Sequence, residues 1–214
     1  LIGASGCGKS TLLNILAGVL HPQKGSFFVD GQRIKGISSH FAYMPQSDLL
    51  LPWKTILDNV TLYAQIHHDV KNARQKALAE FPAFGLSGYE NAYPHELSGG
   101  MRQRAAFLRT ALCAAQIMLL DEPFGALDVI TRNEMQDWLL RLRSELQKTT
   151  LLVTHDIDEA LYLSDRILVL GGSPASIVKE IDLRNVVKSR DWLFAQGDLR
   201  KESYAILRGK NHAS

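Results

Sequence analysis

A glycine-rich octapeptide near the start of the chain constrains the fold more than any other feature of the sequence. It reads Gly3-Ala4-Ser5-Gly6-Cys7-Gly8-Lys9-Ser10 and matches G-x-x-x-x-G-K-[ST], a loop that wraps phosphate groups between a strand and a helix. The apolar pair Leu1-Ile2 precedes it, and the helix-forming run Thr11–Ala17 follows. Glycines let backbone N–H groups turn inward, Lys9 supplies charge to the β- and γ-phosphates, and the Ser10 hydroxyl can bind Mg²⁺. The sequence therefore predicts ATP or GTP binding, and the alternative is a chance glycine-rich turn.

A second glycine motif lies about ninety residues further along the chain. It reads Leu97-Ser98-Gly99-Gly100-Met101-Arg102-Gln103-Arg104 and begins a predicted helix that runs to Cys113. Ser98 is a good N-cap, and the free N–H groups of Gly99 and Gly100 form a second anion site at a helix N-terminus. Taken alone, the motif is also compatible with an ordinary capped helix start.

Two predicted strands are followed by side chains that could bind metal or take part in catalysis. The apolar run Ile117–Leu120 ends in Asp121-Glu122, which is typical of a buried parallel strand whose carboxyl end faces a ligand. Asp121 is expected to hold Mg²⁺ through water. The run Thr150–Thr154 delivers His155 directly before a capped helix start. A strand followed by a solvated acidic turn, and a solvated histidine, are the alternatives for these two segments.

In this order the motifs resemble those of the ATP-binding-cassette (ABC) ATPases. Leu97–Gly100 matches the signature sequence of that family, Phe124–Asp128 its D-loop and His155 its switch histidine. The resemblance implies that Glu122 orients or deprotonates the attacking water as general base. It also implies that His155 contacts the γ-phosphate, and that Gln46 touches Mg²⁺ and the attacking water.

The same resemblance implies a head-to-tail dimer with a second copy of the ATPase subunit, in which the signature sequence of one chain closes on ATP held by the other. Three sets of site residues follow from it. The residues expected to act in catalysis are Glu122, His155 and Gln46. The residues expected at Mg²⁺ are Ser10, Gln46 and Asp121. The residues expected to contact ATP are Gly3, Ser5, Gly6, Cys7, Gly8, Lys9, Ser10, Thr11, Ser98, Gly99, Gly100 and Asp128.

An apolar, aromatic-tipped loop follows Gln46. The stretch Leu49–Trp53 is either a core plug or a docking surface, because exposed apolar loops usually mark a partner. In ABC transporters this region receives the coupling helix of the transmembrane permease subunit. The L-L-P-W stretch resembles importers of nitrate, sulfonates, taurine and pyrimidine precursors of thiamine. The resemblance implies a peripheral subunit on the cytoplasmic face of the plasma membrane, served indirectly by a solute-binding protein.

The spacing of the motifs predicts an α/β fold. The expected architecture is a P-loop NTPase (RecA-like) core with a mostly parallel sheet and an inserted helical subdomain. Expected boundaries are 1–46 for the phosphate-loop part, 47–100 for the helical subdomain, 101–183 for the rest of the core and 184–214 for a tail. Beyond the strands above, strands are expected at 26–29, 41–44, 166–170 and 176–180, and a helix at 129–148. The tail is expected to fold back on the core, with a docking helix or a membrane-surface patch as alternatives.

Composition narrows the classes of partner. A net charge of +2 is too small to predict a nucleic-acid partner. The apolar runs are shorter than the roughly twenty residues of a membrane-spanning helix, so membrane association is expected to come through a partner. Cys7 lies in the phosphate loop and Cys113 at a predicted helix end, and neither position suits a structural disulfide.

The chain begins at Leu1, within the strand that feeds the phosphate loop. ABC ATPases carry further strands and an adenine-stacking aromatic residue before this point. The sequence is therefore expected to be N-terminally truncated, and no residue is assigned to adenine stacking. The alternative functions are an inactive nucleotide-binding module and a soluble ABC-type ATPase acting on ribosomes or DNA. A P-loop kinase is a weaker candidate, since it needs neither the signature sequence nor the D-loop.

Overall fold

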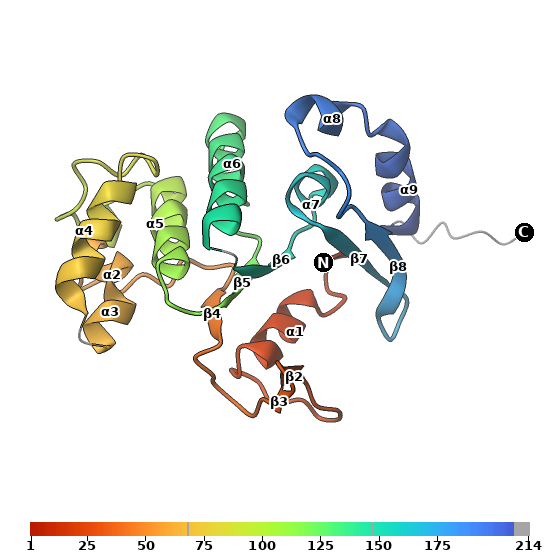
Figure 1. The fold of residues 1–214 in the computed structure, drawn as a ribbon, viewed down its shortest axis with the longest axis horizontal. Coiled ribbons are helices and arrows are strands. Elements are labelled where there is room, and N and C mark those ends of the chain that lie inside the picture. The colour runs from red at the N-terminus through yellow and green to blue at the C-terminus, as the bar shows by residue number, and fades with distance from the viewer. Residues whose placement is uncertain (68, 147, 208–214) are drawn as a thin grey trace, which may run out of the picture.

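Two three-stranded sheets meet edge to edge at the centre of the computed structural model, which describes residues 1–67, 69–146 and 148–207 (Figure 1). In the first sheet the strands run parallel in the order β4 (Phe41–Met44), β5 (Ile117–Asp121) and β6 (Thr149–Val153). In the second sheet β7 (Arg166–Gly171) pairs in parallel with β1 (Ile2–Gly3) and antiparallel with β8 (Ser176–Asp182).

Backbone hydrogen bonds beside β1 join the two sheets. The nitrogen of Leu1 donates to the Leu152 carbonyl at 2.6 Å, and the Thr154 N–H donates to the Leu1 carbonyl at 3.2 Å. Leu1 thus donates to one residue of the neighbouring segment and accepts from the residue two positions further on, which is the hydrogen-bond pattern of parallel strands. The strand order is therefore β4-β5-β6-β1-β7-β8, and only the last pairing is antiparallel. The predicted α/β core with a mostly parallel sheet is confirmed.

A small hairpin stands apart from this sheet. β2 (Phe28–Val29) pairs antiparallel with β3 (Gln32–Arg33), a strand that the sequence analysis did not predict. The connecting residues Asp30 and Gly31 have φ of 48° and 78°. An Asp-Gly pair with two positive φ values is the preferred two-residue hairpin turn, because its twist matches that of the strands.

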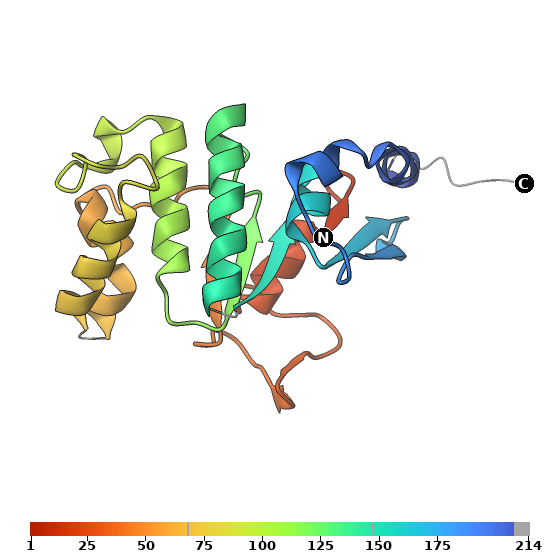
Figure 2. The same ribbon diagram turned by 45° about the horizontal axis from the view of Figure 1, so that its top comes forward.

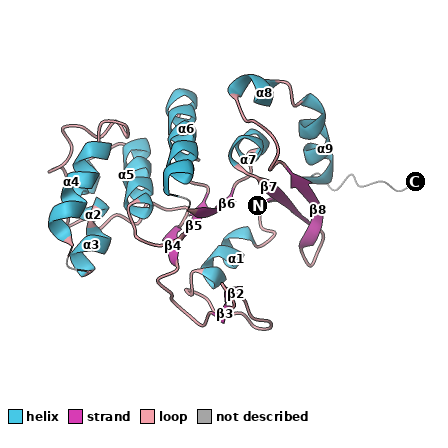
Figure 3. Cartoon of the chain, in the orientation of Figure 1, coloured by secondary structure: helices cyan, strands magenta, loops and turns pink. Residues whose placement is uncertain are grey.

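Helices cover both faces of the sheet (Figure 3). α1 (Lys9–Leu16) packs against β5 on one face. On the other stand α5 (Gly99–Ala111), α6 (Val129–Leu146) and α7 (Ile157–Leu163). The helix predicted over 129–148 is observed up to Leu146, and residue 147 lies outside the described residues.

A helical arm extends from one side of the sheet (Figure 2). It contains α2 (Ile56–Val60), α3 (Leu62–Ile66), α4 (Val70–Glu80) and a short 3₁₀ turn at Pro94–Glu96. An aromatic cluster joins this arm to the core. Phe84, which follows α4 in the arm, has its ring centre 4.6 Å from that of Trp138 on α6, and the Trp138 ring lies in turn 5.5 Å from that of Phe107 on α5. Edge-to-face pairs of this kind each contribute about 0.5–1.5 kcal/mol beyond area burial.

The described part of the predicted tail 184–214 folds back on the core, as expected, and residues 208–214 lie outside the described residues. α8 (Arg190–Phe194) and α9 (Gly197–Leu207) pack beside α7, and α9 also contacts β7. Leu193 is buried, and the Arg190 guanidinium lies 3.9 Å from the centre of the Tyr162 ring. No helix in the described part of the chain has both the length and the apolar character needed to cross a membrane.

Candidate active site

The phosphate loop joins β1 to α1 and is exposed along most of its length. Gly6 and Gly8 have φ of 78° and 99°, a left-handed backbone that glycine adopts without strain. Gly8 is the N-cap of α1, so the first N–H groups of the helix, from Lys9 onward, have no intrahelical partner. A Cβ at Gly3 would approach the Cys7 sulfur to 2.8 Å, which favours glycine there. The loop therefore presents free donors and the positive end of a helix dipole.

Lys9 is buried within this loop, with only 7% of its surface exposed. Its Nζ donates to the carbonyls of Gly3 at 2.8 Å and Ala4 at 2.9 Å. These bonds hold the ammonium charge inside the loop. Ser5, Ser10 and Thr11, the other polar residues predicted to contact ATP there, are exposed around it.

Asp121 is a buried carboxylate at the end of β5. Its Oδ1 has no hydrogen-bond partner within the described structure. Burial raises the pKa of Asp121, while the nearby Ser10 hydroxyl and the Lys9 ammonium lower it and Glu122 raises it further. A buried, unsatisfied carboxylate oxygen is costly unless a donor or a cation meets it.

These donors fit a magnesium ion. Mg²⁺ prefers oxygen ligands and is usually held by one or two carboxylates together with substrate phosphates. The Asp121 carboxylate, the Ser10 hydroxyl and the Gln46 amide oxygen are donors of that class. No group of three or more His, Cys, Asp or Glu side chains that could hold a metal alone lies together in the described residues.

The carboxylate of Glu122 lies between two side chains that follow other strands. Its Oε1 is 3.1 Å from His155 Nδ1, and its Oε2 accepts from Gln46 Nε2 at 3.3 Å. Glu122 has a φ of 49°, an uncommon backbone for a non-glycine residue, and its N–H donates to the Val153 carbonyl at 2.9 Å. Left-handed backbone of this kind costs about 1–3 kcal/mol and clusters at functional sites. The structure thus brings the three predicted catalytic residues together.

The order of the strands explains why these side chains lie close together. Gln46 follows β4, Asp121 ends β5, His155 follows β6, and Lys9 follows β1. These four strands are neighbours and run parallel, so their carboxyl ends open at one edge of the sheet. Parallel α/β sheets bind their ligands at that edge.

The signature residues are not part of this cluster. Ser98 is the N-cap of α5, and its Oγ accepts from the Met101 N–H at 3.3 Å. Both ribbon views place the start of α5 well away from the loop between β1 and α1 (Figures 1 and 2). A Cβ on Gly100 would lie 3.5 Å from Leu127, so this helix start packs beside the D-loop.

Asp128 ends the D-loop and caps α6. Its Oδ1 accepts from the N–H groups of Ile130 and Thr131, each at 3.1 Å. Hydrogen bonds, first from the Thr131 side chain, lower the pKa of Asp128. The structural role as a cap is observed, and contact with ATP remains a prediction.

Gln103 is a residue that the sequence analysis did not assign. Its buried Nε2 donates to the carbonyls of Glu122 at 3.4 Å and Pro123 at 3.2 Å. It therefore connects α5 to the backbone that presents Glu122. The sequence feature that could have indicated Gln103 is an amide side chain on the apolar face of a predicted helix, because a buried polar side chain needs a hydrogen-bond partner.

Cys7 is expected to make the phosphate loop sensitive to thiol reagents. Its sulfur is half-buried and lies 3.9 Å from Lys9 Nζ. We expect N-ethylmaleimide to abolish nucleotide binding, because the adduct occupies loop space, and we expect bound ATP to protect. Burial raises the pKa of the Cys113 thiol, which slows its reaction. Fluorescent-nucleotide titration after alkylation should find Cys7→Ser insensitive and Cys113→Ser still sensitive, and inactivation of Cys7→Ser would contradict this assignment.

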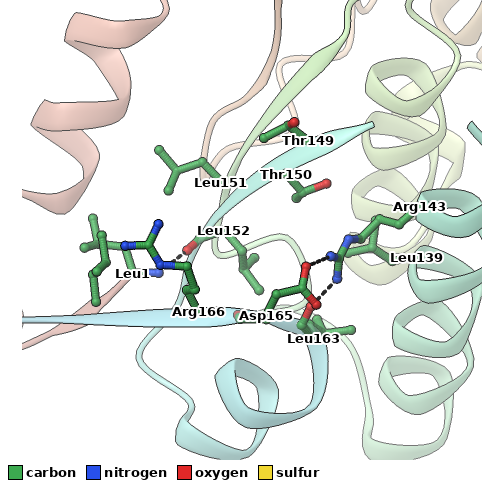
Figure 4. A pocket seen from close by; sticks show the side chains of 12 residues that line it. Leu1, Leu139, Arg143, Thr149, Thr150, Leu151, Leu152, Leu163, Asp165 and Arg166 are labelled. Atoms are coloured by element: carbon green, nitrogen blue, oxygen red, sulfur yellow. Dashed lines mark hydrogen bonds and ion pairs between the residues drawn. The ribbon is translucent and has the colours of Figure 1, made fainter. Parts of the chain in front are cut away.

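A separate pocket opens between β6 and β7 (Figure 4). Its lining includes Leu1, Leu139, Leu152 and Leu168, and it contains the ion pair between Arg143 and Asp165. The Arg143 guanidinium also donates to the Leu163 carbonyl. None of the residues predicted to contact the nucleotide lines this pocket.

Known proteins are similar to this chain in both sequence and fold. The family model described as "ABC transporter" matches residues 1–125. "Formylaminopyrimidine import ATP-binding protein ThiZ" of Halalkalibacterium halodurans is 42% identical over 213 residues, which cover 97% of this chain and 83% of the relative. "Aliphatic sulfonates import ATP-binding protein SsuB 1" of Xanthomonas axonopodis pv. citri is 46% identical over 179 residues, which cover 83% and 71%.

Among solved structures, one described as a dimeric post-hydrolysis state of the ATP-binding cassette MJ0796 bound to ADP and Pi superposes with a TM-score of 0.74. It is 30% identical in sequence, and the match covers 86% of this chain and 84% of that chain. The likeness therefore extends over most of the chain rather than the phosphate loop alone.

Proposed function

The chain belongs to the ABC transporter family, and from this membership we propose that it is the ATP-hydrolysing subunit of an importer of a small solute. The observation that carries the proposal is the Glu122 carboxylate, held between Gln46 and His155 beside Asp121. The importer names of the two relatives favour transport over an ATPase acting on ribosomes or DNA.

Each residue of the site has a role in the proposed reaction. Water attacks the γ-phosphorus, the bond to the β–γ bridging oxygen breaks, and ADP and inorganic phosphate leave. Glu122 takes the proton of the attacking water, and Gln46 and His155 hold its carboxylate in place. Lys9 and the N–H groups at the start of α1 bind the phosphate oxygens.

Magnesium is the proposed cofactor beside ATP. When bound, it neutralises charge on the β- and γ-phosphate oxygens. Ser10, Gln46 and Asp121 are the residues that would hold it, directly or through water. The orphaned Oδ1 of Asp121 supports this assignment.

We further propose that two copies of the subunit pair head to tail. Within one chain the start of α5 lies away from the phosphate loop, so Ser98, Gly99 and Gly100 need a second copy to reach ATP. The dimeric cassette with the same fold supports this arrangement. Asp128 would then meet the partner's nucleotide from the D-loop.

Mixing two inactive variants tests the head-to-tail arrangement. Lys9→Ala spoils the phosphate loop, and Gly99→Asp places a negative charge where the signature meets phosphate. Each variant alone should be inactive, whereas the mixture should recover up to about a quarter of wild-type ATPase activity, because half of randomly mixed dimers contain one intact site of two. Phosphate release in a titration of one variant against the other measures this. No recovery in mixtures shown to form heterodimers would contradict the arrangement.

The proposed permease contact is the docking loop, which we define as residues 48–53. Leu49 is 61% exposed and Trp53 is 71% exposed, although both are large and apolar. Exposed apolar side chains on one loop usually mark a partner surface. The subunit would then be peripheral on the cytoplasmic face of the membrane and would meet the solute-binding protein only through the permease.

The transported solute is chosen by the permease and the binding protein. The two relatives are named for aliphatic sulfonates and for formylaminopyrimidine. We propose a sulfonate, taurine, nitrate or a pyrimidine precursor of thiamine as the class. Calorimetric titration of the cognate binding protein with one compound of each kind would assign it.

A further inference from the structure

The docking loop is fastened to the helix that begins with the signature sequence. Arg109, on α5, donates from Nη1 to the Leu49 carbonyl at 2.8 Å and from Nη2 to the Asp48 carbonyl at 2.7 Å. Leu49 has a φ of 43°, a left-handed backbone that leucine rarely adopts. Such a conformation persists only where the surroundings fix it. The tip of the docking loop is therefore held in one shape by α5.

Arg102 makes a second attachment and reaches the signature sequence as well. Its Nε donates to Asp48 Oδ2 at 3.1 Å, and its Nη1 donates to the Leu97 carbonyl at 2.8 Å. Leu97 directly precedes Ser98, the N-cap of α5. The Arg102 and Asp48 side chains are 36% and 30% exposed, so their ion pair is partly shielded from water. One planar guanidinium thus spans from the docking loop to the signature sequence.

The other end of the docking loop is fixed by a buried asparagine. Asn59 on α2 is fully buried, accepts from the Leu51 N–H at 2.7 Å and donates to the Leu51 carbonyl at 3.1 Å. α2 in turn packs on α5. The docking loop is therefore attached to α5 directly, through Arg102 and Arg109, and indirectly, through Asn59 and α2, and of these attachments only Arg102 also contacts the signature sequence.

We propose that Arg102 is a positioning residue that transmits movement of the docking loop to the signature residues Ser98–Gly100. The inference rests on the proposed docking of a permease at residues 48–53. Without Arg102, the Arg109 bonds still hold the loop and Ser98 still caps α5, but the direct link between Asp48 and Leu97 is lost. Lysine cannot replace it, because a single ammonium lacks the planar fork that spans two acceptors.

The test compares ATPase rates with and without the permease. Each variant is purified alone and in a nanodisc complex with the permease, and the ratio of the two rates at saturating Mg·ATP is measured. Arg102→Gln and Arg102→Lys should lower this ratio about fivefold, while ATP affinity of the isolated subunit and the amount of permease bound stay within about twofold of wild type. The control Arg74→Gln removes the 3.0 Å ion pair with Asp58, which has similar exposure but does not touch the loop, and it should behave as wild type.

A second variant asks whether Asp48 and Arg102 act as one link. In the wild type the Leu50 N–H donates to Asp48 Oδ1, and Asp48→Asn keeps an oxygen that can accept this bond. The variant removes the negative charge that pairs with Arg102. If the two side chains form one link, the double variant should be no worse than Arg102→Gln alone.

Three outcomes would overturn the inference. If the double variant lowered the ratio of ATPase rates by the sum of the two single effects, Asp48 and Arg102 would act independently rather than as one link. An Arg102→Gln complex stimulated as strongly as wild type would remove Arg102 from transmission, and failure of that variant to bind the permease would give it a docking role instead. By contrast, a wild-type subunit that neither binds the permease nor is stimulated by it would overturn the proposed function itself.

Discussion

Glu122→Gln is expected to slow ATP hydrolysis about a hundredfold to ten-thousandfold while leaving ATP affinity nearly unchanged. The amide has the size of the carboxylate, so the contacts with Gln46 and His155 are disturbed little. It cannot take a proton from the attacking water, however. Because hydrolysis would normally separate the two subunits, an ATP-bound dimer should accumulate.

Single-turnover phosphate release and a fluorescent-nucleotide titration measure the two effects separately. Size-exclusion chromatography with ATP reports the dimer. Glu145→Gln, on the exposed side of α6, is the matched control and should behave as wild type. Full hydrolysis by Glu122→Gln would contradict the assignment of Glu122 as general base, and a loss of ATP affinity would make its role one of binding.

Lys9→Ala is expected to weaken ATP binding about a hundredfold or more, since a charge-assisted hydrogen bond contributes about 1.5–3 kcal/mol and the ammonium would meet both the β- and the γ-phosphate. The change also removes the bonds to the Gly3 and Ala4 carbonyls, which loosens the loop itself. The effect should therefore appear in the dissociation constant rather than only in the turnover rate.

The same titration with Lys24→Ala provides the control for this variant. Lys24 is exposed and lies outside the phosphate loop, so its removal changes net charge equally without touching the site. Thermal unfolding of both variants separates a local change in the loop from a loss of the fold. Wild-type affinity in a folded Lys9→Ala protein would remove Lys9 from the phosphate site.

The parts of the fold that sequence could predict are those with a local pattern. The apolar run ending in Asp121-Glu122 indicates a buried strand and its carboxyl end in one stretch, and β5 follows it to Asp121. The phosphate loop likewise carries its glycines, its lysine and its helix together. Once strand ends are known, parallel pairing brings Gln46 and His155 to Glu122 without further information.

The contacts that sequence could not predict depend on partners far away in the chain. Arg102 and Arg109 resemble any basic residues on a helix, and nothing local indicates that both meet a loop more than fifty residues earlier. Gln103 is similar, because its acceptors lie on the segment after β5. The hairpin strand β3 was missed although Asp30-Gly31 was a recognisable turn signal, because its two-residue strands are too short for a periodic pattern.

Co-purification from detergent-solubilised membranes tests the importer assignment most directly. The tagged full-length protein is compared with Trp53→Ala, which changes only an exposed side chain of the docking loop. The account predicts that a multi-spanning membrane protein is recovered in stoichiometric amount with the wild type and is depleted with Trp53→Ala, while ATP affinity is equal in both. Recovery of ribosomes, DNA or no partner would contradict transport and leave only the ATPase assignment.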